Sequence, residues 1–171
     1  GDDPSRIELI VRGTLVSTGT PVNHIALTSD AATPAPRDWY GLRFEDTASD
    51  VASSSAYADF TAAWHGIEFE DAGPALAQVR STGNHRHGLY IHHNGGATFP
   101  LSISVVGGSL SSNGGCGVSL VAEGSLPLSF QGTTVELNGW EGMYLYWYGG
   151  AADLALDDLS LLKLGAFLAL F

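Results

Sequence analysis

The sequence is poor in positive charge. Lysine and arginine together number 7 among 171 residues, against 18 aspartate and glutamate residues, so the formal net charge is −11. Lysine occurs once, at Lys163. Binding to nucleic acid or to an anionic membrane surface depends on clustered lysine and arginine. This composition argues against both partners and favours a neutral or cationic ligand, or a bound cation.

Sulfur and targeting signals are equally scarce. The single cysteine, Cys116, excludes an intrachain disulfide, so the folded state depends on its core. The N-terminal GDDPSRIELI has acids where a signal peptide carries basic residues. The apolar tail over 159–171 is too short to span a bilayer and contains Lys163. We expect one soluble, mature or excised domain over residues 1–171.

Glycine, in contrast, recurs at regular intervals. Five short stretches that alternate apolar and polar residues each begin at a glycine, with spacings of 25, 22, 29 and 25 residues. The glycines are Gly41, Gly66, Gly88, Gly117 and Gly142. A repeat of this length with a strand after each glycine is typical of solenoids, in which each position of the coil forms a ladder on one face.

The alternation within each copy predicts a strand with one buried face. The residues one and three places after each glycine are all apolar, whereas those two and four places after it are mostly polar or amphipathic. The inward pairs are Leu42/Phe44, Ile67/Phe69, Leu89/Ile91, Val118/Leu120 and Met143/Leu145. A second strand in each coil is predicted at Ile103/Val105, Leu128/Phe130 and Leu154/Leu156, with counterparts at 56–60 and 75–79. A shorter third strand is predicted around Leu110 and Val135.

Three short strands in each turn of about 25 residues predict an all-β fold. The specific expectation is a right-handed, single-stranded parallel β-helix of about six coils, with residues 157–171 as the final coil or cap. Asparagine also recurs four residues before the glycine, at Asn84, Asn113 and Asn138. Asparagine tolerates the left-handed backbone of a tight corner, and stacked amides can bond from coil to coil. We expect a structural role for these three residues.

Residues 6–46 carry a more specific pattern. Gly-Thr-Leu is followed by Gly-Thr, by a strand ending in Thr-Ser, and by Trp-x-Gly-apolar-x-Phe. This segment resembles the first coil of the right-handed parallel β-helix repeat proteins secreted by bacteria, the pectate-lyase-like family. The glycine repeats extend the resemblance to about residue 147. It implies the fold and an extracellular, bacterial location, but lyases, hydrolases, adhesins and carbohydrate-binding modules share this architecture.

The outward strand positions suggest a ligand surface. Tyr90, Tyr144 and Tyr146 lie at outward positions, and amphipathic rings on a flat sheet can stack against sugars. Glu68, Glu70, His92 and Arg43 would supply hydrogen bonds to hydroxyl groups, and Trp140 or Trp147 would border the groove. Glu45 and Asp46 align with Glu70 and Asp71 on the next coil. These four acids predict either a solvated surface, the commoner outcome, or a Ca²⁺ site; no other cofactor is expected.

These features together favour a non-catalytic carbohydrate-binding module. It would bind a plant or microbial polysaccharide, with xylan favoured, and would be tethered to a secreted glycoside hydrolase, as the resemblance implies. The first alternative is a structural or adhesive segment of a bacterial surface protein. The second is a small glycan lyase or hydrolase, since Glu68 and Glu70 on one strand face would be about 6.5–7 Å apart. The related enzymes lead one to expect a basic proton abstractor and a Gly-His-Gly motif, but the single lysine lies in the tail, Arg43 lies among acids, and Arg86-His87-Gly88 matches that motif only in part.

Overall fold

A computed structural model describes residues 6–95, 101–150, 153–162 and 168–170. Eighteen strands and no helix occur within these residues, so the predicted all-β class is confirmed. No helix in the described part of the chain is therefore long and apolar enough to cross a membrane. Every pairing between named strands is parallel.

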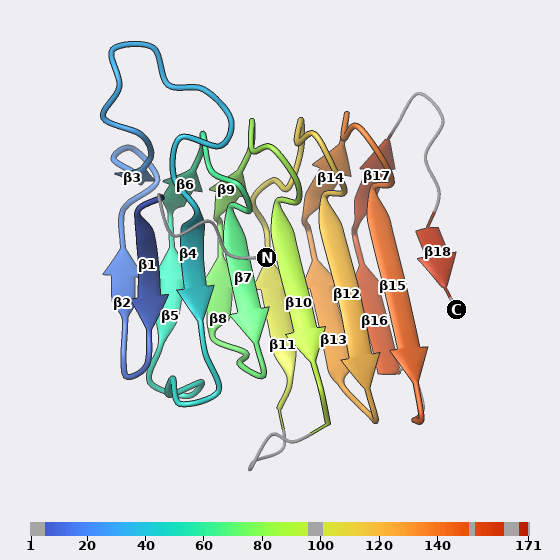
Figure 1. The fold of residues 1–171 in the computed structure, drawn as a ribbon. Coiled ribbons are helices and arrows are strands. Elements are labelled where there is room, and N and C mark those ends of the chain that lie inside the picture. The colour runs from blue at the N-terminus through green and yellow to red at the C-terminus, as the bar shows by residue number, and fades with distance from the viewer. Residues whose placement is uncertain (1–5, 96–100, 151–152, 163–167, 171) are drawn as a thin grey trace.

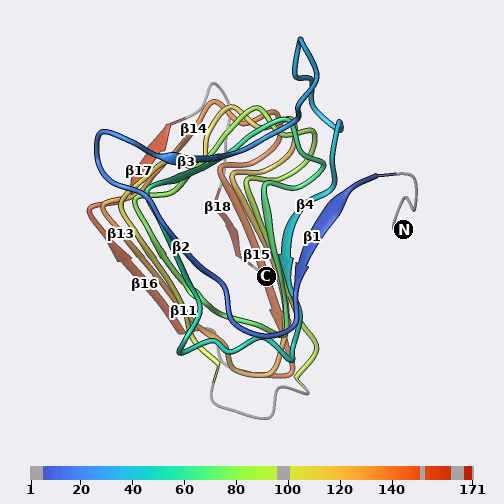
Figure 2. The ribbon, with the colours of Figure 1, turned by 90° about the vertical axis from the view of Figure 1, so that its left-hand side faces the viewer.

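The strands form three rows, each visited in turn as the chain advances (Figure 1). The seven-stranded sheet has the order β1 (Glu8–Val11), β4 (Gly41–Phe44), β7 (Ile67–Glu70), β10 (Leu89–His93), β12 (Val118–Glu123), β15 (Met143–Tyr148) and β18 (Leu168–Leu170). The six-stranded sheet has the order β16 (Asp153–Asp157), β13 (Pro127–Gln131), β11 (Ile103–Val106), β8 (Ala75–Ala77), β5 (Ser54–Ala56) and β2 (Val16–Thr18). The third row contains β3 (Ile25–Leu27), β6 (Ala58–Phe60) and β9 (Arg80–Ser81), then β14 (Thr134–Glu136) and β17 (Ser160–Leu162). Viewed along the stack, successive coils overlie one another (Figure 2).

The core lies between these rows. All ten inward residues predicted on the seven-stranded sheet are at most 1% exposed, which confirms the period-two pattern. Ile103, Val105, Leu128 and Phe130 are equally buried from the six-stranded sheet. Each such side chain contributes about 1.5–3 kcal/mol by leaving water. Leu156 is 40% exposed instead, because β16 is the last strand of its sheet.

The asparagine ladder forms as predicted. The Asn84 Nδ2 donates to the Asn113 Oδ1 at 3.0 Å, and the Asn113 Nδ2 donates to the Asn138 Oδ1 at 3.2 Å. All three residues are buried. The same carbonyl oxygens accept bonds from backbone N–H groups of the preceding coil, so the ladder ties three coils together.

The backbone conformation at this corner differs from the expectation. The left-handed residue is the one before each asparagine, namely Gly83 (φ 65°), Ser112 (φ 57°) and Leu137 (φ 56°). The prediction that asparagine itself takes this conformation is wrong. Its amide is needed at the corner because it pairs with buried backbone groups, not because it tolerates a positive φ.

The ladder also explains three of the five repeating glycines, namely Gly66, Gly88 and Gly117. A Cβ on Gly66 would lie 2.7 Å from the Asn84 Nδ2, and a Cβ on Gly88 would lie 2.8 Å from the Asn113 Nδ2. Real Cβ atoms do not approach so closely. The glycine of one coil therefore leaves room for the asparagine of the next, which links the two repeating residues physically.

Two predicted segments have a different layout. Residues 56–60 were expected to form one strand, but Tyr57 (φ 48°) turns the chain there, so β5 ends at Ala56 and β6 begins at Ala58. In the tail, β17 pairs with β14 and β18 pairs with β15, as a further coil would. The rest of the predicted cap, over 163–167 and at 171, lies outside the described residues.

Candidate functional site

The outward face of the seven-stranded sheet carries the predicted ligand residues in two rows. Strand register aligns Arg43, Glu68, Tyr90, Ser119 and Tyr144 in the first row. The second row aligns Glu70, His92, Val121 and Tyr146. Neighbouring members of a row lie roughly 4.8 Å apart at the backbone. The alternation in the sequence therefore identified both rows.

A cleft of about 440 Å³ lies over β4, β7, β10 and the turns that precede them. Half of its lining was predicted from the sequence, namely Arg43, Glu68, Glu70, Tyr90 and His92. The other half was not, namely Tyr40, Trp64, His65, Arg86 and His87. The cleft thus brings together carboxylate, guanidinium, phenol, indole and imidazole groups.

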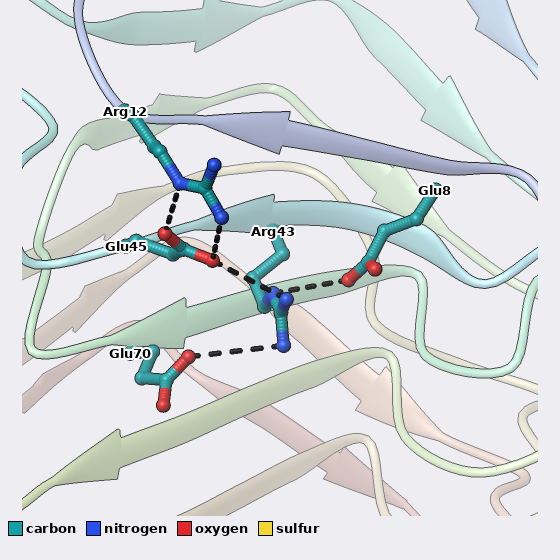
Figure 3. Close-up of polar contacts among 5 residues, drawn as sticks. All are labelled: Glu8, Arg12, Arg43, Glu45 and Glu70. Carbon is teal, nitrogen blue, oxygen red and sulfur yellow. Dashed lines mark hydrogen bonds and ion pairs between the residues drawn. The ribbon is translucent and has the colours of Figure 1, made fainter. Parts of the chain in front are cut away.

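Arg43 fixes one end of the cleft through a network of ion pairs (Figure 3). Its Nε lies 3.0 Å from the Glu8 Oε1, its Nη2 lies 3.3 Å from the Glu45 Oε1, and its Nη1 lies 3.8 Å from the Glu70 Oε2. Arg12 also donates to the Glu45 Oε2 at 2.6 Å. This hydrogen bond lowers the pKa of Glu45 despite some desolvation. Two guanidinium groups therefore relieve the repulsion within the acidic ladder.

The four predicted calcium ligands line a second hollow of about 510 Å³, together with Thr47 and Asn94. Glu45 is paired with arginine there, and the Asp71 Oδ1 accepts a hydrogen bond from the His93 Nδ1 at 2.8 Å. Within the described residues, no group of three or more His, Cys, Asp or Glu side chains is arranged to hold a metal ion. A Ca²⁺ site on Glu45, Asp46, Glu70 and Asp71 stays a prediction.

Three rings stack in the cleft. The His65 ring lies 4.9 Å from the Tyr90 ring and 5.1 Å from the His87 ring, with interplanar angles of 18° and 16°. The stacked His65 imidazole covers part of the Tyr90 ring, which was predicted from the sequence to stack against a sugar. Burial, and then the charges of Glu68 and Glu70, raise the pKa of Tyr90, so its hydroxyl remains a donor at neutral pH.

The two imidazoles are held in their neutral form. Burial is the main cause that lowers the pKa of His65 to about 3, with His87 contributing next. Burial and then Arg86 lower the pKa of His87 to about 4. The backbone N–H of Cys116 donates to the His87 Nδ1 at 3.0 Å, which places the ring proton on Nε2. Neutral imidazoles offer both donors and acceptors without a net charge.

Trp140 lies at the rim of the cleft. It is 46% exposed, the His87 ring lies 5.7 Å from its ring, and the Arg86 guanidinium lies 5.1 Å from its ring centroid. Arg86 also lies 5.5 Å from the ring centroid of Trp64, so the guanidinium is positioned between two indoles. An exposed indole beside a polar cleft is a suitable stacking surface for a ligand ring.

The tyrosines of β15 lie apart from the cleft. Tyr146 is 37% exposed, and its ring lies 5.8 Å from that of Tyr148. Strand β12 separates these tyrosines from β10. Trp147 is 6% exposed and belongs to the core, so its assignment to the groove is corrected. Its position continues the inward row of Met143 and Leu145 along β15.

The residues that the sequence analysis missed follow a repeating position of their own. Tyr40, His65 and His87 each come directly before a repeat glycine, and all three are buried beside the cleft. Cys116 and Glu141 continue this ladder in the later coils, and the Cys116 thiol donates to the Glu141 Oε2 at 3.3 Å. The recurrence of a ring at this position in the first three coils was the signal available.

Comparison of the chain with protein-family models, with curated proteins and with solved structures found no significant match. The functional conclusion therefore depends on the residues of this face and on their geometry.

Proposed function

We propose that this protein binds a polysaccharide on the outward face of its seven-stranded sheet, as a non-catalytic module of a secreted enzyme. The observation that carries the proposal is the cleft over β4, β7 and β10, in which neutral hydrogen-bonding groups lie beside the exposed ring of Trp140. A sugar needs many directed hydrogen bonds and an apolar ring face, and this cleft offers both.

The polar groups suit hydroxyl ligands. The Tyr90 hydroxyl and the His87 Nε2 can donate, while the carboxylates of Glu68 and Glu70 accept. Arg43 is held by its ion pairs with surrounding carboxylates, which keeps this end of the cleft in a fixed shape. Preorganised polar groups reduce the entropy lost on binding, so modest contacts are enough for specific recognition.

A polymer would lie across the strands, along the stack of coils. The first outward row runs from β4 to β15, four strand spacings or roughly 19 Å. Trp140 and the tyrosines of β15 would contact the sugars beyond the cleft. We propose that the coils form a right-handed parallel β-helix of about six turns, which the parallel pairing of all named strands supports. A xylan-type polymer is the favoured ligand.

Affinity electrophoresis of the wild-type protein against soluble xylans, glucans, mannans and pectins tests this function. Selective retardation is expected, with about a fivefold or greater loss of affinity for Trp140→Ala, since stacking on an aromatic ring contributes about 1–3 kcal/mol. The combined change Tyr144→Ala and Tyr146→Ala should weaken retardation further. Leu156→Ala, which truncates an exposed leucine on the six-stranded sheet, is the control and should bind normally.

Two outcomes would contradict the proposal. Absence of retardation by every polymer would favour the structural or adhesive function instead. Release of new reducing ends or unsaturated products, lost in Glu68→Gln, would indicate a glycan hydrolase or lyase that uses the carboxylates of this cleft.

A further inference from the structure

Three of the six arginines surround one tryptophan at the edge of the cleft. The guanidinium carbons of Arg37, Arg6 and Arg86 lie 4.9, 5.1 and 5.5 Å from the ring centroid of Trp64. We call these three arginines the arginine corner. The protein carries a net charge of −11, so half of its arginines gather at one place on an otherwise acidic molecule.

The remaining arginines are engaged by acids. Arg12 and Arg43 pair with Glu45, and the Arg80 Nε lies 3.8 Å from the Asp59 Oδ1. In contrast, no ion pair joins Arg37 or Arg86 to a carboxylate within the described part of the chain. Arg37 and Arg86 therefore carry positive charge that no carboxylate of the described residues neutralises through an ion pair.

Stacking leaves these guanidinium groups able to bind an anion. A guanidinium over an indole uses its flat face, while its N–H donors point outward in the plane. The His85 ring lies 4.6 Å from the Trp64 ring, and burial followed by the charges of Arg37, Arg86 and Arg6 lowers the pKa of His85. His85 thus remains neutral at pH 7, and the charge of the corner resides on the arginines.

We propose that the arginine corner binds the carboxylate of an acidic sugar, so that the polysaccharide recognised by this protein carries uronic acid residues. This inference rests on the proposed function. Trp64 and Arg86 line the cleft themselves, so a sugar bound there can direct its carboxylate to the corner without leaving the cleft. The planar fork of arginine matches a carboxylate with two parallel hydrogen bonds.

The rest of the charge distribution favours a polymer with widely spaced carboxylates. Glu68 and Glu70 lie in the same cleft, and the acidic hollow lined by Glu45 and Asp46 is adjacent. A dense polyanion would meet these carboxylates on every sugar. A largely neutral backbone with occasional uronic acid branches would place one carboxylate at the arginine corner and hydroxyl groups elsewhere.

A matched pair of polymers tests the inference. One is a xylan substituted with glucuronic acid, and the other is the same polymer after chemical reduction of its carboxyl groups to alcohols. We expect wild-type protein to bind the acidic form about tenfold more tightly, as one charge-assisted pair provides. Arg37→Gln should remove most of this preference while retaining affinity for the reduced polymer, because Arg37 does not line the cleft. Arg86→Gln should remove the preference together with part of the affinity for the reduced polymer, because Arg86 lines the cleft.

The control is Arg80→Gln, which removes one positive charge on β9, away from the cleft. It should retain the full preference. Arg86→Lys keeps the charge but not the planar fork, so an intermediate preference is expected. The preference should also fall as salt is added.

The outcomes separate the two proposals. Equal binding of both polymers by the wild-type protein would overturn the arginine corner as a carboxylate site and leave the polysaccharide function standing. An equal loss of preference in Arg80→Gln would overturn it as well, because the effect would then be one of overall charge. Binding of neither polymer would overturn this inference together with xylan as the ligand, whereas absence of retardation by the whole panel of polysaccharides is the result that overturns the proposed function itself.

Discussion

The stability of this protein should depend steeply on pH through two buried histidines. His65 and His87 are 9% and 7% exposed, and their pKa values lie at about 3 and about 4 in the folded state. In the unfolded chain both return to about 6.5. Below pH 6.5 the unfolded state therefore binds two protons that the folded state excludes.

The sign and size of the effect follow from linkage. Above pH 6.5 both states are neutral and no stability is lost. As the pH falls below 6.5 the free energy of unfolding decreases, and the decrease levels off once the folded-state pKa values near 4 and 3 are passed. Between pH 8 and pH 5 each histidine contributes about 2 kcal/mol, or about 4 kcal/mol for the pair.

Urea unfolding at pH 8, 6.5 and 5 measures this loss. The double variant His65→Gln and His87→Gln is expected to be less stable at pH 8, but its stability should change with pH by about 4 kcal/mol less than that of the wild type. His92→Gln, on the same face of the sheet, is the matched control. Taking the difference between variants removes the contributions of all other titrating groups.

An equal loss of stability in the wild type and in the double variant would refute this account. A direct test is the titration of the ring protons by NMR. The His65 and His87 resonances should remain those of neutral imidazole at pH 5. Titration of either ring near pH 6.5 would mean that water reaches it and that the stacked rings are not closed to solvent.

Three further predictions concern the asparagine ladder, the repeat glycines and the acidic hollow. Asn113→Ala removes hydrogen bonds to Asn84, Ser81 and Asn138 and should lower the free energy of unfolding by about 3–5 kcal/mol in chemical unfolding. The control Asn23→Ala changes an exposed residue and should be nearly neutral. An equal effect of both variants would contradict the stabilising role of the ladder. Gly88→Ala should be comparably harmful and Gly13→Ala harmless, because only the first Cβ meets atoms of the next coil. If the acidic hollow holds Ca²⁺, calcium should raise Tm and EDTA should lower it in the wild type but not in Asp71→Asn; no response to either reagent would exclude the ion.

Much of the fold follows from the sequence because its repeat and its alternation agree. The inward row at Leu42, Ile67 and Leu89 is apolar in every coil, so the strand phase is fixed independently several times. Trp147 was assigned to the wrong face because its residue type was given more weight than its position in the strand. Its position continues the inward row, yet its residue type suggested a surface platform, and the parity of the strand proved decisive.

The site was only half predictable because half of it lies outside the strands. Glu68 and Tyr90 occupy outward strand positions, where the period of two specifies the face. Trp64, His65 and Arg86 occupy turns, where the period of two does not specify the direction of a side chain. Only the recurrence of a ring before the repeat glycine pointed to His65. The orientation of these turn residues depends on how side chains of adjacent coils pack against one another, and that depends on pairs of residues 20 or more positions apart.

A hollow on a flat sheet requires a change in side-chain size along a row, and the turns before the repeat glycines provide it. Trp64, Arg86, Gly115 and Trp140 hold the same position in successive coils. Because Gly115 has no side chain, the Trp140 ring crosses its coil and reaches Arg86 and His87. A Cβ at Gly115 would lie 2.8 Å from the Arg86 carbonyl oxygen and 2.9 Å from the His87 Nδ1. The missing side chain is therefore as much a part of the site as the rings around it, since it allows an indole from a later coil to complete the rim of the cleft.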